Sequence, residues 1–171
     1  MIIVRYADDF IVGFQHEADA RRFLDMMRER LQEFALSLHP EKTRLIEFGR
    51  LAAENRKRRG LGKPETFIFL GFIFICSKTR QGKFQIKRKT RWDRMRAKLQ
   101  AIKQELRRSM HQPIPEQGKW LKQVVTGYFN YHAVPGNLVA LQTIRREVVR
   151  AWLAVLKRRS QRHRLPWERF R

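Results

Sequence analysis

The chain has 171 residues, of which 43% are hydrophobic, and its 38 Lys and Arg against 16 Asp and Glu give a net charge of +22. This composition excludes a disordered basic tail, and the length allows one sizeable domain or two small ones. So large a charge opposes compaction, so we expect a polyanionic partner. Nucleic acid is favoured over an anionic membrane surface, and structural binding of the ribosomal kind remains an alternative.

Cys76 is the single cysteine, which excludes an intrachain disulfide and a multi-cysteine zinc site. The five histidines show no close spacing of the kind that metal ligands need. We find neither a run of about twenty apolar residues nor a signal peptide. The sequence therefore predicts a cytoplasmic protein, associated with the nucleoid or a ribonucleoprotein and not with a membrane.

Residues 2–14 predict a β-hairpin with two adjacent carboxylates at its tip. Two runs rich in β-branched and aromatic residues, 2–5 and 10–14, flank Tyr6-Ala7-Asp8-Asp9. Carboxylate oxygens suit Mg²⁺, which usually takes one or two of them together with substrate phosphates. Asp8 and Asp9 are therefore candidates for a phosphoryl-transfer metal site. The alternative is an Asp-rich turn stabilised by local hydrogen bonds.

Helix and strand patterns alternate over the next part of the chain. The predicted elements are a helix over residues 17–38, a strand over 44–48, a basic loop over 55–64, and an apolar strand run over 66–76 with its hairpin partner at 84–86. Pro40 is expected to end the helix, because proline disfavours helical geometry in the residue before it. The turn of the last hairpin is expected near Gly82. Residues 1–88 thus indicate an α+β domain or part of one.

After Lys89 the apolar residues recur at helical spacing and predict three helices. The stripes are Trp92, Met95, Leu99, Ile102, Leu106 and Met110; then Trp120, Leu121, Val124, Val125 and Tyr128; and, from about Leu138, Leu141, Ile144, Val148, Trp152 and Val155. These stripes can be buried only against one another, which predicts a small bundle. Its outward faces are strongly basic, and the density of cations favours phosphate contact over simple solvation. The last helix carries Arg145, Arg146, Arg150, Lys157, Arg158 and Arg159.

Four short motifs follow one another along the chain. They are Arg5-Tyr6-Ala7-Asp8-Asp9-Phe10, Leu36-Ser37-Leu38-His39-Pro40-Glu41-Lys42-Thr43, Phe69-Leu70-Gly71-Phe72 and Gly127-Tyr128-Phe129-Asn130-Tyr131-His132. In this order they resemble the metal-binding motif of the palm, the lysine motif, the primer-grip hairpin and the aromatic thumb motif of the reverse transcriptases encoded by group II introns, the intron maturases. The resemblance implies an α+β fold: the C-terminal part of a palm over 1–88, a basic all-α thumb or domain X over 89–160, and a truncated C-terminal segment over 161–171.

The resemblance implies an RNA-directed DNA polymerase that uses two Mg²⁺ ions for in-line attack of a primer 3′-hydroxyl on a phosphate. Asp8 would be a ligand shared by both ions, and Asp9 a weaker or outer ligand. Lys42 would lie near the departing pyrophosphate and neutralise its charge or donate a proton. The alternative for Lys42 is an ordinary surface lysine on a loop.

The same resemblance implies nucleic-acid contacts from the hairpins and the basic helices. They are Tyr6, Leu70, Gly71, Arg91, Arg94, Lys98, Arg145, Arg146 and Arg150. Gly71 would let the backbone approach the primer closely, or it marks a bulge in the strand. The aromatic motif at residues 127–132 is expected to pack and specify the fold more than to contact nucleic acid.

The family's active site also needs a carboxylate from a strand upstream of the hairpin, and this sequence begins at the hairpin. Glu47, the other acid in a predicted strand, is in the wrong order. We therefore expect a fragment that binds RNA template, primer, DNA product and structured intron RNA but is catalytically incomplete. Two alternatives stay open: a non-catalytic RNA-binding maturase with a vestigial Asp pair, and one half of a split polymerase. The split enzyme would need a fingers–palm half or a second copy, and exposed apolar surface on residues 2–14 would favour it.

Overall fold

The structure is a computed structural model, and it describes residues 1–159. The segment predicted at 161–171 lies outside the described residues. The chain forms two compact units, Met1–Glu65 (the first unit) and Thr66–Arg171 (the second unit). Each described unit combines strands with helices, so the predicted α+β class is confirmed. The division into a palm part and a thumb at residue 88 stays a prediction.

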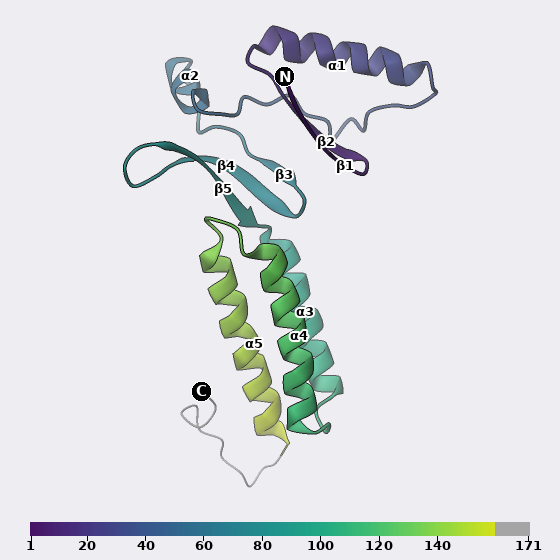
Figure 1. Cartoon of the computed structure of the whole chain (residues 1–171), viewed down its shortest axis with the longest axis vertical. Helices are drawn as coiled ribbons and strands as arrows, with labels where there is room; N and C mark the ends of the chain where they lie inside the picture. Colours follow the sequence, from purple (N-terminus) through teal and green to yellow (C-terminus); the bar gives the residue numbers. More distant parts are fainter. Residues whose placement is uncertain (160–171) are drawn as a thin grey trace. The chain divides into compact units, whose positions relative to one another are not determined.

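The first unit contains a hairpin and two helices (Figure 1). They are β1 (Ile2–Tyr6), β2 (Asp9–Gly13), α1 (Glu17–Gln32) and α2 (Ala52–Arg58). The two strands are antiparallel, with Tyr6 opposite Asp9 beside the turn, so the predicted hairpin is confirmed. Phe14 follows β2 and packs on Phe23 of α1, with 5.3 Å between the ring centroids.

Helix α1 ends earlier than predicted, and a left-handed residue, not Pro40, ends it. Ala35 has a φ of +54°. The N–H of Ala35 donates to the carbonyl of Gln32 at 3.0 Å, and the N–H of Leu36 donates to that of Leu31 at 2.9 Å. This is the Schellman pattern, which satisfies the last carbonyls of a helix. Glycine usually occupies the left-handed position, so an alanine there gives no sequence signal.

Two further elements of the first unit differ from the prediction. Residues 44–48 form no strand, because no neighbouring strand within residues 1–159 pairs with them. The predicted loop over 55–64 is helical in its first part, α2. An ion pair between Glu54 and Arg58, 2.8 Å apart and four residues apart in sequence, supports this helix, and Gly60 ends it at a φ of +68°.

The second unit begins with a three-stranded antiparallel sheet in the order β3-β4-β5. Its strands are β3 (Phe67–Phe69), β4 (Phe72–Lys78) and β5 (Phe84–Thr90). The apolar run over 66–76 is thus two strands, and Gly71 lies in the turn between them and not in a bulge. The predicted partner is confirmed, since Cys76 lies opposite Ile86.

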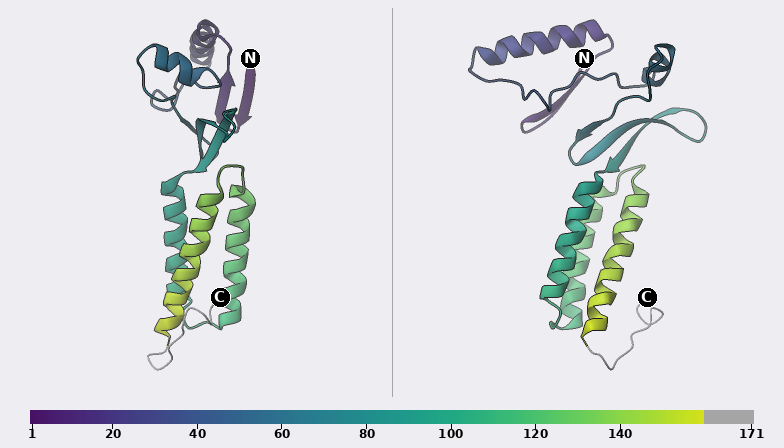
Figure 2. Two further views of the ribbon diagram at one scale, coloured as in Figure 1. Left: turned by 90° about the vertical axis from the view of Figure 1, so that its left-hand side faces the viewer. Right: turned by 180° about the vertical axis from the view of Figure 1, so that it is seen from behind.

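Three helices follow the sheet and run side by side in both views of Figure 2: α3 (Trp92–Arg108), α4 (Ile114–His132) and α5 (Leu138–Arg158). The predicted stripes make the core, except that Trp92 is 58% exposed. Leu106 is completely buried. The buried cluster is Met95, Ile102, Leu106, Leu121, Ile144, Val148 and Val155. Within the described residues no helix is long and apolar enough to cross a membrane.

A buried polar network joins the end of the sheet to the helices. Asn137 precedes α5 and is 2% exposed; its Oδ1 accepts from the Thr90 N–H at 3.0 Å. Its Nδ2 donates to Thr90 Oγ1 at 2.7 Å and to the His132 carbonyl at 2.9 Å. Thr90 Oγ1 also lies 3.1 Å from His132 Nδ1. The network fixes the ends of β5, α4 and α5 to one another.

Acid should weaken this junction through His132. Burial lowers the pKa of His132 below its ordinary value of 6.5, so the folded chain takes up a proton less readily than the unfolded chain. The free energy of unfolding should therefore fall as the pH drops below about 6.5, because the unfolded state then binds more protons. We expect a lower urea midpoint at pH 5 than at pH 7.5, and a smaller difference in His132→Gln. An equal pH dependence in both proteins would contradict this account.

Candidate nucleic-acid interface

The tip of the β1–β2 hairpin, which carries Asp8 and Asp9, is exposed. Asp8 lies in the turn and Asp9 begins β2, both exposed, and Tyr6 opposite Asp9 is 64% exposed. Ala7 has a φ of +48°, and its carbonyl accepts from Arg5 Nε at 3.0 Å. No third His, Cys, Asp or Glu of the described residues completes a metal cluster here. Two exposed carboxylates are nevertheless the donor set that Mg²⁺ takes together with substrate phosphates.

Lys42 is exposed on the segment after α1. The N–H of Thr43 donates to the carbonyl of His39 at 2.9 Å, which closes the turn that carries this lysine. Its role at a pyrophosphate stays a prediction. Glu47, the other acid considered as a ligand, makes an ion pair with Arg59.

The turn between β3 and β4 is held on both sides by helices of its own unit. Leu70 and Gly71 have φ values of +48° and +75°, the combination of a type I′ turn. The Leu70 carbonyl accepts from the Tyr131 hydroxyl of α4 at 2.8 Å, and the Gly71 carbonyl accepts from the Arg91 N–H beside α3 at 3.3 Å. A Cβ added to Gly71 would meet no atom within 4 Å, so the positive φ is what favours glycine here.

The aromatic motif at 127–132 packs on this turn, in agreement with its predicted structural role. Tyr131 stacks on Phe72 with 5.7 Å between the ring centroids, and His132 contacts Phe72 edge-on at 5.2 Å. Burial raises the pKa of the Tyr128 hydroxyl, and the Thr90 side chain opposes that rise. These rings therefore join the sheet to α4.

The predicted cations at the start of α3 differ in whether an acidic side chain pairs with them. Arg91 is bound by Asp93, with Nε and Nη2 donating to the two carboxylate oxygens at 3.0 and 2.5 Å. Hydrogen bonds from Arg91 hold the pKa of Asp93 below its ordinary value. Arg94 and Lys98 are exposed, and the structure records no ion pair for either within residues 1–159. Of the three cations predicted to bind phosphate here, Arg94 and Lys98 are therefore the more available.

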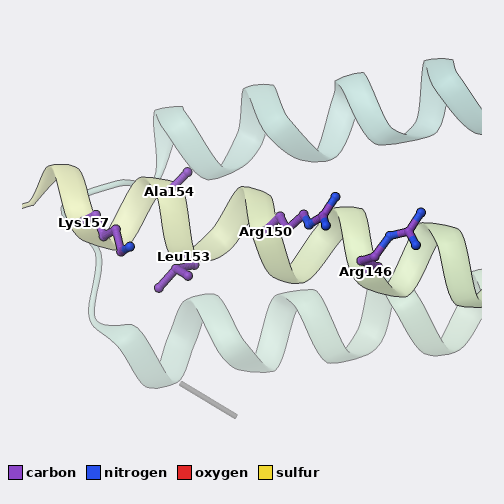
Figure 3. A pocket seen from close by; sticks show the side chains of 5 residues that line it. All are labelled: Arg146, Arg150, Leu153, Ala154 and Lys157. Carbon is purple, nitrogen blue, oxygen red and sulfur yellow. The ribbon is translucent and has the colours of Figure 1, made fainter. Parts of the chain in front are cut away.

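Helix α5 carries a shallow pocket of about 470 Å³ with cations along its length (Figure 3). Its lining residues are Arg146, Arg150, Leu153, Ala154 and Lys157. Glu147 pairs with Arg150 at 3.1 Å and lies 3.6 Å from Arg146, so one carboxylate faces two guanidinium groups. Arg145, also predicted to bind nucleic acid, is exposed beside this group.

Positive charge is concentrated in the second unit. The first unit holds 13 Lys and Arg and 11 Asp and Glu, a net charge of +2. The second unit holds 25 Lys and Arg and 5 Asp and Glu, a net charge of +20. The chain's total of +22 is therefore carried almost entirely by residues 66–171, and the polyanion we expect should bind to this unit.

Sequence reasoning missed the buried polar residues that join the elements of the second unit. Gln117 is 1% exposed; its Nε2 donates to the Ser109 carbonyl at 2.7 Å and its Oε1 accepts from Trp152 Nε1 at 2.9 Å. Asn137 follows Pro135-Gly136 and precedes a helical stripe, which is an N-cap pattern that could have identified it. No local pattern marks Thr90 or Gln117.

Residues 1–74 match the family model described as "Reverse transcriptase (RNA-dependent DNA polymerase)". The matched region includes the hairpin with Asp8 and Asp9, Lys42, and the Leu70-Gly71 turn. Comparison with curated proteins gave no match, and neither did comparison with solved structures. The reverse-transcriptase resemblance is thus supported over the first part of the chain, and the group II intron type stays a prediction.

Proposed function

We propose that the chain is the C-terminal palm and the thumb of a reverse transcriptase of the group II intron type, with maturase-like binding of structured RNA. The match of residues 1–74 to the reverse-transcriptase family carries this proposal. The basic three-helix bundle after the matched region supports it, because a thumb that binds primer and template needs many phosphate ligands. In this proposal the chain binds RNA and primer–template.

In this function the two units have separate tasks. The hairpin of the first unit presents Asp8 and Asp9, which would hold Mg²⁺ together with the phosphates of the substrate. The ion would stabilise negative charge on the reacting phosphate oxygens. The second unit binds the nucleic acid through Arg94, Lys98 and the cations of α5.

Asp8→Asn tests whether the hairpin takes part in binding. We expect the wild-type chain to bind an RNA-templated primer more tightly with Mg²⁺ than without it, because the ion joins the carboxylates to the phosphates. Asp8→Asn should abolish this Mg²⁺ effect and retain the Mg²⁺-independent affinity. Fluorescence anisotropy of a labelled primer–template, with Ca²⁺-free buffers and Asp25→Asn as the matched surface control, measures both quantities.

The alternative of a non-catalytic RNA-binding maturase makes the opposite prediction for the same experiment. If the Asp pair is vestigial, Mg²⁺ will have the same effect on the wild-type chain, on Asp8→Asn and on the control. That result would leave RNA binding as the function and remove the polymerase site from it.

One observation favours the alternative of a split polymerase. The first strand exposes Ile2, Ile3 and Val4 by 72%, 54% and 48%, and side chains on both of its faces are therefore unburied. Within the described residues β1 pairs only with β2, so its other edge is free. A two-stranded hairpin is marginal in water, and a free apolar edge accepts a further strand. A polypeptide that supplies such a strand is the partner this alternative needs.

A further inference from the structure

The turn that carries Asp8 is built on an alanine in the left-handed conformation. Its two residues are Ala7 and Asp8, since Tyr6 lies opposite Asp9 in the antiparallel ladder. Ala7 has a φ of +48°. A residue with a Cβ is strained there, because the Cβ comes close to the following carbonyl oxygen, whereas glycine takes the conformation freely. An alanine keeps such a conformation only where the surrounding structure holds it.

Side-chain packing does not hold this turn. The large side chains beside it on the two strands are exposed: Val4 by 48%, Tyr6 by 64% and Phe10 by 42%. The buried residues of the first unit, Ala20 and Ala52, belong to its two helices. The conformation of Ala7 is therefore held by the backbone ladder of the hairpin and by local hydrogen bonds.

One side chain supplies such a bond. Arg5 Nε donates to the Ala7 carbonyl at 3.0 Å, and within residues 1–159 the structure records no other side-chain hydrogen bond to the turn. The donor is a guanidinium, and hydrogen bonds from charged donors are stronger than those between neutral groups. The bond ends on the residue that is strained, so it stabilises the left-handed conformation directly.

Arg5 is placed to act on the carboxylates through the turn. In the ladder Arg5 lies opposite Phe10, and Tyr6 lies opposite Asp9. Successive side chains of a strand point to opposite faces, so Arg5 and Asp9 project from opposite faces of the hairpin. Arg5 therefore reaches the backbone of the turn and does not occupy the face that presents Asp9.

We propose that Arg5 is a positioning residue, which holds Ala7 in its left-handed conformation and so keeps Asp8 and Asp9 arranged to bind Mg²⁺ with a substrate phosphate. The inference rests on the proposed function and deepens it, because it makes the affinity of the metal site depend on a residue that is not a ligand. Without the bond from Arg5, Ala7 adopts the conformations with negative φ that alanine prefers. The two carboxylates then no longer share one fixed arrangement, which a metal site needs.

The test is the Mg²⁺ concentration that gives half of the Mg²⁺-dependent increase in primer–template affinity, measured on the whole chain by fluorescence anisotropy. Arg5→Met keeps a long unbranched side chain and removes the donor. We expect the half-maximal Mg²⁺ concentration to rise about fivefold, the effect of one net hydrogen bond. The affinity without Mg²⁺ should change little, because the second unit provides it.

Arg22→Met is the matched control for the lost charge. Arg22 is exposed on α1, and the structure records neither an ion pair nor a side-chain hydrogen bond for it within the described part of the chain. Its replacement removes one positive charge from the same unit and leaves the turn unchanged. The half-maximal Mg²⁺ concentration should therefore equal that of wild type.

Glycine at position 7 separates positioning from a general effect of the arginine. Because glycine takes a positive φ without strain, the turn should form without the bond from Arg5. The double variant Arg5→Met/Ala7→Gly should therefore return to within about twofold of the wild-type half-maximal Mg²⁺ concentration. An arginine that acted by its charge, or by contacting the nucleic acid, would not be replaced by a glycine in the turn.

Three results would overturn the inference and leave the proposed metal site intact. Arg5→Met could need no more Mg²⁺ than Arg22→Met, it could lose its Mg²⁺-independent affinity to the same extent, or glycine at position 7 could fail to restore the Mg²⁺ response. A different result would refute the proposed function of the hairpin itself: a wild-type chain whose affinity for primer–template does not respond to Mg²⁺.

Discussion

Replacing Asn137 by alanine should destabilise the second unit by about 3 kcal/mol. The asparagine is almost completely buried and makes three hydrogen bonds, two with Thr90 and one with the carbonyl of His132. Alanine would leave the buried Thr90 N–H without a partner, which costs about 1 to 3 kcal/mol, and would remove two further hydrogen bonds worth about 1 kcal/mol each. The His132 carbonyl would keep its bond from the Val134 N–H at 2.8 Å. Urea unfolding followed by tryptophan fluorescence measures the loss, since Trp120 and Trp152 pack on the bundle core.

Two control variants make this prediction specific. Asn130→Ala removes an exposed asparagine from α4 and should change the free energy of unfolding by less than about 0.5 kcal/mol. Asn137→Asp keeps an acceptor for the Thr90 N–H but turns a carboxylate oxygen toward the His132 carbonyl at a buried site, so it should destabilise the unit at least as much as alanine does. A loss below about 1 kcal/mol in Asn137→Ala would mean that the network does not hold the sheet to the helices.

The cations beside the pocket of α5 should account for a large share of RNA affinity. Arg146, Arg150 and Lys157 lie on one side of this helix, with the apolar Leu153 and Ala154 between them. A phosphate contact to single-stranded nucleic acid contributes roughly 0.7 log units of affinity at 0.1 M salt relative to 1 M. Changing all three cations to glutamine should therefore lower affinity on the order of 10²-fold, as measured by fluorescence anisotropy.

A matched variant separates this local effect from the loss of net charge. Arg21, Arg22 and Arg28 on α1 are exposed in the first unit, where acids nearly balance the cations. Changing them to glutamine removes the same total charge and should lower affinity only a fewfold. If both triple variants lose affinity equally, net charge and not the face of α5 binds the RNA.

Regular periodicity explains which parts of the fold could be predicted. The hairpin at residues 2–14 follows from two runs of β-branched and aromatic residues around a short polar segment. The stripes of α3, α4 and α5 follow from helical spacing, because each of these helices buries one face. The end of α1 could not be predicted, because Ala35 takes a left-handed conformation and alanine gives no sequence signal for it. The prediction of a strand at 44–48 was wrong, because a strand also needs a neighbouring strand to pair with, and local sequence does not specify one.

The candidate site was predictable where a motif carries its chemistry within a few residues. Asp8 and Asp9 are adjacent in sequence, so their shared tip follows from the hairpin alone. The contact of Tyr131 with Leu70 spans 61 residues and the contact of Asn137 with Thr90 spans 47. Such pairs are set by how the sheet and helices pack, and a single sequence without periodic signal does not reveal them. The guanidinium of Arg91 pairs with Asp93, which the sequence did not reveal, and the role of Arg91 as a nucleic-acid ligand stays a prediction.

We expect this chain to bind nucleic acid through the basic faces of its second unit. The most direct test is the affinity of the wild-type chain for RNA over a series of salt concentrations. Phosphate contacts release counterions, so the logarithm of affinity should fall linearly with the logarithm of salt concentration, with a slope of about −3.5 or steeper for five contacts or more. A flat dependence on salt would contradict the account, because no set of phosphate contacts could then be holding the RNA.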